Sequence, residues 1–121
     1  MSIKPIGWIG SAKQDLQRFP AEAVIEIGHA LYYAQLGEKH GSAKPLKGFG
    51  GAGVLEVVED YDGDTFRAVY TVRFAEVVYV LHAFQKKAKK GISTPPQEIE
   101  KVKARLKLAE QEHVIWKSRN P

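Results

Sequence analysis

Alternating apolar and polar side chains between Thr65 and Phe74 form the clearest pattern in the chain, and this period of two is typical of a strand. The segment Val54–Tyr61 before it is also predicted to be a strand, and the intervening Asp62-Gly63 is typical of a tight hairpin turn. A further apolar run predicts a third strand at Val77–Phe84. Together the three segments predict an antiparallel meander.

Apolar positions at helical spacing predict three helices. A short helix begins at Ser11, and Pro20 separates it from a second one. The last helix begins at Thr94-Pro95-Pro96-Gln97, where Thr94 is predicted to cap the first turn and Gln97 to complete a capping box. The second and last helices each carry an apolar stripe, formed by Val24, Ile27, Leu31 and Ala34 and by Ile99, Val102, Leu106 and Ala109.

The predicted order of elements is βααβββα, with a first strand at Ile6–Ile9 and a glycine-rich loop at His40–Gly53. A length of 121 residues suits one domain, so we expect a single domain over residues 1–121. The predicted fold class is α+β, with a small, mostly antiparallel sheet and the helices packed on one face.

The composition narrows the possible functions. The chain has no cysteine, which excludes disulfides and thiolate metal sites and favours a cytoplasmic location. No apolar stretch reaches the roughly 18 residues of a membrane span, and no signal peptide is recognised. Residues 1–85 carry 8 Lys+Arg and 10 Asp+Glu, whereas residues 86–121 carry 10 and 4. This basic C-terminal part indicates either a nucleic-acid partner or a solvated lysine-rich surface.

Arg67, Thr71 and Arg73 share the predicted polar face of one strand. Arginine binds phosphate through two parallel N–H bonds, but these two arginines are roughly 20 Å apart at strand rise. An extended RNA backbone could therefore contact both, and an ordinary solvated face is the alternative. Because Arg67 is predicted to leave the apolar face, its removal is expected to cost little stability.

A basic segment follows the third strand of the meander. Phe84 stands beside four lysines at positions 86, 87, 89 and 90, a combination that suits base stacking and phosphate binding. A solvated loop and a core role for Phe84 are the alternatives. His82 is a candidate acid or base, or else a structural residue. The four histidines lack metal-ligand spacing, so neither metal nor cofactor is expected.

Several segments resemble the HigB-like, phage-derived group of the RelE/ParE toxins. They are Phe66-Arg67-Ala68-Val69-Tyr70, the segment LHAFQKK at residues 81–87, and Thr94-Pro95. The N-terminal runs Trp8-Ile9-Gly10-Ser11 and Gly28-His29-Ala30-Leu31 are also similar, so the resemblance covers nearly the whole chain. It implies a RelE-like fold with the order βααβββα.

The resemblance implies the toxin of a type II toxin–antitoxin system. Such a toxin cuts mRNA on the ribosome without a metal, by attack of a 2′-OH on the neighbouring phosphate. The implied partners are mRNA, the ribosome and a helix-turn-helix, HigA-like antitoxin, with no membrane. A ParE-like inhibitor of DNA gyrase and a non-catalytic nucleic-acid or protein-binding module are the alternatives.

Carried onto this sequence, the resemblance implies that Arg67 and Arg73 stabilise charge on the phosphate in the transition state. Lys86 or Lys87 is the candidate base or acid, and His82 is the alternative for that role. The residues expected to bind RNA are Lys47, Thr71, Phe84, Lys89 and Lys90.

Overall fold

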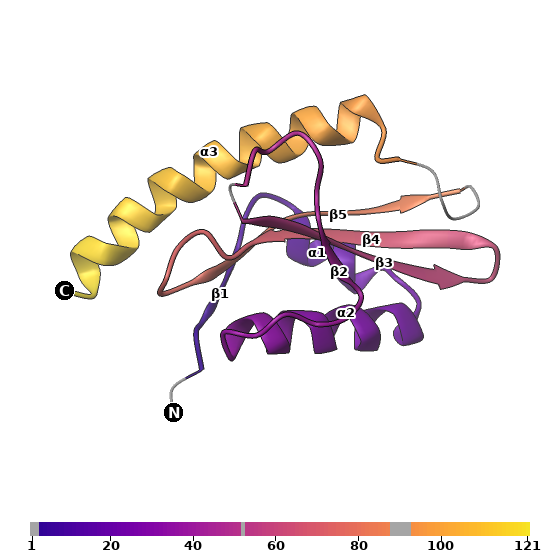
Figure 1. Cartoon of the computed structure of the whole chain (residues 1–121), viewed down its shortest axis with the longest axis horizontal. Coiled ribbons are helices and arrows are strands. Elements are labelled where there is room, and N and C mark those ends of the chain that lie inside the picture. The colour runs from indigo at the N-terminus through magenta and orange to yellow at the C-terminus, as the bar shows by residue number, and fades with distance from the viewer. Residues whose placement is uncertain (1–2, 52, 88–92) are drawn as a thin grey trace.

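A computed structural model describes residues 3–51, 53–87 and 93–121 of the chain. Its centre is a five-stranded sheet in the order β1-β5-β4-β3-β2 (Figure 1). In chain order the elements are β1 Ile6–Trp8, α1 Ala12–Gln17, α2 Ala21–Gln35, β2 Ala43–Pro45, β3 Val54–Tyr61, β4 Asp64–Thr71, β5 Val78–Lys86 and α3 Pro96–Arg119.

The predicted meander is confirmed. β3 pairs with β4 and β4 with β5, both antiparallel, and β1 adds a parallel strand beside β5. Asp62 and Gly63 have φ angles of 52° and 85°, so both residues of the hairpin turn are left-handed, as the Asp-Gly sequence favours. The α+β class of the fold is also confirmed.

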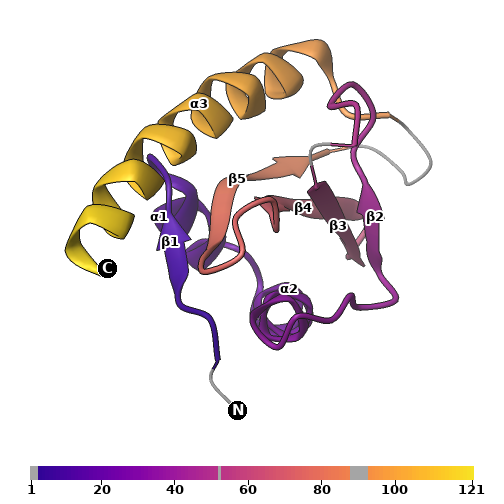
Figure 2. The ribbon, with the colours of Figure 1, turned by 60° about the vertical axis from the view of Figure 1, so that its left-hand side comes forward.

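Helices cover both faces of the sheet, so the predicted packing on one face was wrong. Ala68 and Tyr70 of β4 pack in the cluster that includes α1 and α2, whereas Val69 packs in the cluster that includes α3 (Figure 2). The physical reason is that β5 is apolar on both sides, with Val78 and Val80 in the first cluster and Tyr79 and Leu81 in the second. A strand of this kind must be buried on both faces.

The glycine-rich segment contains a strand that the prediction missed. β2 pairs antiparallel with β3, with Ala43 opposite Val57, and the N–H of Leu46 donates to the carbonyl of Val54 at 2.9 Å. The order is therefore βααββββα. A three-residue strand carries too little pattern to be recognised, because its stability comes from pairing with β3 and not from local sequence.

Arg105 joins α3 to two segments that are distant in sequence. Its NH1 group donates to the carbonyl of Leu81 at 3.0 Å, and its NH2 group donates to Ser11 Oγ at 3.0 Å. Ser11 Oγ itself donates to Asp15 Oδ2 at 2.7 Å and makes no side-chain cap bond at the start of α1. Arg105 thereby fixes α3 against β5 and the start of α1.

We predict that Arg105→Met will destabilise the fold by roughly 2–3 kcal/mol, because hydrogen bonds to a charged group contribute about 1.5–3 kcal/mol. Methionine preserves much of the apolar stem. Urea unfolding will measure the loss, and Lys103→Met on the same helix is the control, since the Lys103 side chain is half exposed. Equal unfolding midpoints for the two variants would contradict this role of Arg105.

Candidate active site

Arg67 is buried between the sheet and the start of α3, with only 2% of its surface exposed. The sequence predicted an open polar face here and little loss of stability on removal, and the burial contradicts both expectations. The alternation itself was right, since Arg67 points away from the side of Ala68 and Tyr70. The pattern did not show that α3 covers the side of β4 on which Arg67 lies.

Glu56 of β3 is the acidic partner of Arg67. Cross-strand pairing of Val58 with Arg67 and of Glu56 with Val69 puts both charged side chains on one face. Arg67 NH1 lies 3.7 Å from Glu56 Oε1. Because a buried guanidinium is costly without an opposite charge, this pair is what makes an arginine acceptable beneath α3.

Thr94 completes the arrangement from the segment that precedes α3. Its hydroxyl donates to Glu56 Oε2 at 2.7 Å and accepts from Arg67 NH1 at 3.4 Å. Arg67 Nε also lies 3.4 Å from Thr65 Oγ1. The guanidinium of Arg67 from β4, the carboxylate of Glu56 from β3 and the hydroxyl of Thr94 from the segment before α3 therefore meet at one point.

These groups open onto a pocket of about 580 Å³. Exposed Lys44 and Lys47 stand at its rim, and Leu46 and Ile99 form part of its apolar wall. Its volume is within the usual range for sites that hold small molecules. The pocket is lined by Lys44, Pro45, Leu46, Lys47, Glu56, Arg67, Ser93, Thr94 and Ile99.

Of the predicted site residues, Arg67 and Lys47 lie at this pocket. Lys86 adjoins it, because its Nζ donates to the carbonyl of Ser93 at 3.1 Å. Lys87 is exposed just beyond β5. Lys89 and Lys90 lie outside the described residues. Glu56 and Thr94 were missed, since neither a lone glutamate in a strand nor a threonine before a helix signals a site by itself.

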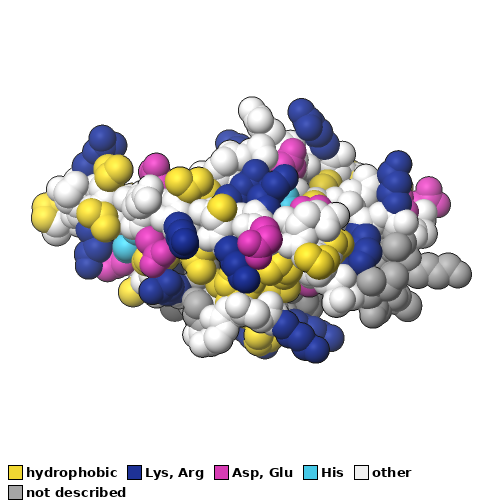
Figure 3. Space-filling view, turned by 90° about the horizontal axis from the view of Figure 1, so that it is seen from above, with side chains coloured by type: hydrophobic (Ala, Val, Ile, Leu, Met, Phe, Trp, Pro, Cys, Tyr) yellow, Lys and Arg dark blue, Asp and Glu magenta, His cyan; other side chains and the backbone are white. Residues whose placement is uncertain are grey.

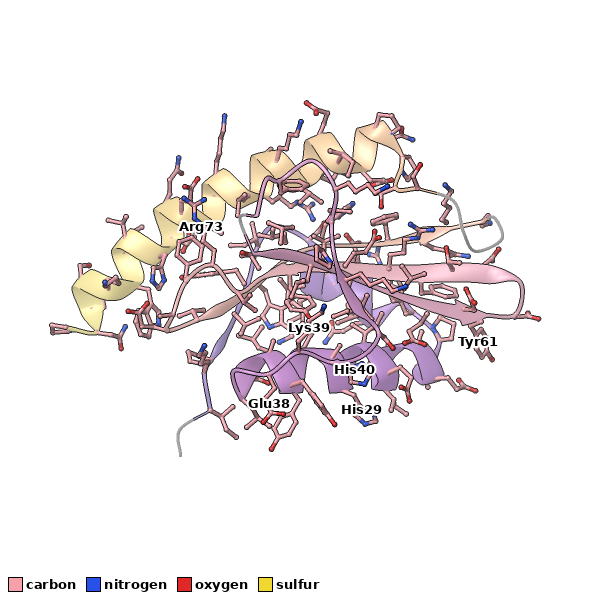
Figure 4. The ribbon with its side chains drawn as sticks, viewed as in Figure 1. His29, Glu38, Lys39, His40, Tyr61 and Arg73 are labelled. Carbon is pink, nitrogen blue, oxygen red and sulfur yellow. The ribbon has the colours of Figure 1, made fainter. Side chains whose placement is uncertain are left out.

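Thr71 shares the face of Arg67 as predicted but does not line the pocket, and Arg73 lies beyond the end of β4. Thr71 is buried, and its hydroxyl donates to the carbonyl of Gly53 and accepts the N–H of Arg73, both at 3.1 Å. This side-chain bond turns the chain and ends β4. Arg73 then reaches α3, where NH1 lies 3.3 Å from Glu110 Oε2 (Figure 4).

His82 is also removed from the pocket, with 3% of its surface exposed. Its Nε2 lies 2.6 Å from Glu98 Oε1, its Nδ1 lies 3.0 Å from Arg105 NH1, and its ring stacks on buried Phe84. Because arginine can only donate, Nδ1 must accept and the Nε2–H must donate to Glu98. His82 therefore joins β5 to α3, and its ring covers one face of the Phe84 ring.

The surface seen from the α3 side carries lysine and arginine side chains spread among acidic and apolar ones (Figure 3). The lysine and arginine side chains drawn on that face therefore form no single patch. No cluster of three histidine, aspartate or glutamate side chains suited to a metal ion occurs in the described ranges. Among the described residues, no helix is long and apolar enough to cross a membrane.

We predict that acid will weaken the fold through His82. Burial lowers the pKa of His82 from its ordinary 6.5, and the Glu98 hydrogen bond only partly opposes this. Between the two pKa values the unfolded chain binds a proton that the folded chain does not, so the free energy of unfolding falls as the pH drops below about 6.5. Urea unfolding from pH 8 to pH 5 will measure this slope.

His82→Gln should flatten that slope, because glutamine does not titrate. His29→Gln is the matched control, since His29 is exposed on α2 (Figure 4). If His82→Gln and His29→Gln keep the same slope, His82 is not the group responsible.

Comparison with known proteins gives a match over most of the chain. Residues 14–107 match the family described as phage derived protein Gp49-like. One similar solved structure is the toxin–antitoxin complex RelBE2 from Mycobacterium tuberculosis, at 18% identity over 72% of this chain and 95% of that chain, with a TM-score of 0.45. That score is too low for any conclusion. The search of curated proteins gives no match.

Proposed function

The chain belongs to the phage-derived Gp49-like family of RelE- and HigB-type toxins, and from this premise we propose that it cleaves mRNA at the pocket around Arg67. We further propose that it acts on the ribosome and that a helix-turn-helix antitoxin silences it. The observation that carries the proposal is that buried Arg67 contacts half-buried Glu56 and Thr94 beneath a lysine-rimmed pocket.

Glu56 is the proposed general base. A carboxylate oxygen that accepts a hydroxyl proton at 2.7 Å from Thr94 Oγ1 can accept one from a ribose 2′-OH in the same position. As that proton leaves, the 2′-oxygen bonds to the neighbouring phosphorus and the bond to the 5′-oxygen breaks. The products are a 2′,3′-cyclic phosphate and a 5′-hydroxyl end.

Positive charge supports the other half of the reaction. Arg67 is proposed to stabilise the extra negative charge on the five-coordinate phosphorus, since its guanidinium is held in place before substrate arrives. Lys86 is proposed to protonate the leaving 5′-oxygen from the edge of the pocket. Lys44, Lys47 and Lys87 are exposed and are proposed to contact the RNA backbone.

We predict that induced expression will arrest bacterial growth and create new mRNA 5′ ends inside open reading frames. These ends should carry a 5′-hydroxyl, because the proposed reaction uses no water. Sequencing of 5′ ends, with plasmid topology measured in parallel, will test this. Intact mRNA with altered supercoiling would instead support inhibition of DNA gyrase, and neither change would favour a non-catalytic module.

We predict that Glu56→Gln will reduce mRNA cleavage by about 100-fold or more, the usual contribution of a general base. Glutamine keeps the size of the side chain and can still accept the Thr94 hydroxyl, but it removes the carboxylate charge opposite Arg67, so the variant is also expected to lose stability. Glu59→Gln is the matched control, because Glu59 lies on the same strand with its side chain on the other face. Both variants should be checked by thermal melting.

Glu56→Gln is preferred to Arg67→Ala because it preserves the shape and the hydrogen bonding of the site. Removing one member of a buried ion pair costs about 3–5 kcal/mol, so Arg67→Ala would confuse loss of activity with loss of the fold. Full cleavage by a folded Glu56→Gln protein would exclude Glu56 as the base.

A further inference from the structure

Thr94 uses its hydroxyl in the pocket and not at the helix that follows it. The sequence predicts Thr94 as the cap of α3, but the N-cap residue is Pro95 and the first turn has no side-chain cap bond. A capping hydroxyl typically stabilises a helix by about 1 kcal/mol. The helix forgoes that bond, and Thr94 Oγ1 binds Glu56 and Arg67 instead.

The two bonds of Thr94 are those that an attacking ribose hydroxyl needs. The nucleophile must donate its proton to the base, and its oxygen must lie beside the group that stabilises charge on the phosphate. Thr94 Oγ1 donates to Glu56 Oε2 at 2.7 Å and lies 3.4 Å from Arg67 NH1.

We propose that Thr94 is an internal competitor for the substrate: its hydroxyl occupies the place of the 2′-OH in the free protein, and RNA must displace it. This inference rests on the proposed function, because it takes Glu56 and Arg67 as the base and the charge-stabilising group. In the free protein the occupied site keeps the carboxylate of Glu56 hydrogen-bonded. Binding of RNA exchanges one hydroxyl for another at that carboxylate.

The exchange requires only a small movement. Thr94 is half-buried, and a rotation about its Cα–Cβ bond moves the hydroxyl away from Glu56 without moving α3. The neighbouring backbone stays held, because the carbonyl of Ser93 accepts from Lys86 Nζ and α3 is fixed through Glu98 and Arg105. Thr94 therefore competes through its side chain alone.

The test compares Thr94→Val, which keeps the branched shape and removes the hydroxyl, with Thr94→Ser, which keeps the hydroxyl. The probe is a short mRNA that contains a cleavage position mapped in cells, presented on 70S ribosomes, and kcat and KM are measured separately. We expect Thr94→Val to lower KM by about tenfold, because the RNA no longer has to displace a hydrogen bond to a charged group. Thr94→Ser should keep the KM of the natural protein.

Two results would overturn the proposal that Thr94 competes with RNA. One is a lower kcat at unchanged KM in Thr94→Val that Thr94→Ser restores, since Thr94 would then position Glu56. The other is no change in either constant for a variant whose melting temperature shows that it is folded. Absence of cleavage by the natural protein is a separate outcome, which overturns the proposed function together with the inference built on it.

Discussion

The burial of one guanidinium decides how this end of the molecule is built. Arg67 lies on the face of β4 that α3 covers, with 2% of its surface exposed, and a charge in that place requires a nearby carboxylate and further hydrogen-bond partners. Glu56 supplies the carboxylate from β3, and Thr94 and Thr65 supply hydroxyls. The groups that satisfy the arginine are also the groups that give the pocket its chemistry.

The pocket exists only because α3 is held at a fixed position over the sheet. Near its start, Glu98 and Arg105 bond to His82, and near its end His113 lies 2.9 Å from both Tyr79 Oη and Glu76 Oε1. The ring of His113 also stacks on the ring of Trp116 in the same helix. His82 and His113 thus fix the helix at two points, and with it the position of Thr94.

The proposed chemistry depends on the same burial. A carboxylate and a guanidinium less than 4 Å apart interact more strongly when water is largely excluded, and neither group has to reorganise when charge develops on a bound phosphate. The lysines of the rim lie in a different setting, because Lys44 and Lys47 are exposed, and their proposed role is to attract RNA without defining its position. Attraction and reaction are therefore assigned to different parts of the pocket.

The sequence by itself determined the meander, the hairpin turn at Asp62-Gly63, three helices, the α+β class and the family, which the match over residues 14–107 confirms. These features are local: period, turn residues and short motifs reside in neighbouring positions. Only the tertiary structure decided that both faces of β4 are covered, that β2 exists, and that Glu56, Arg67 and Thr94 meet. Those three residues come from three elements, and alternation along a strand separates its two faces without indicating what packs on either.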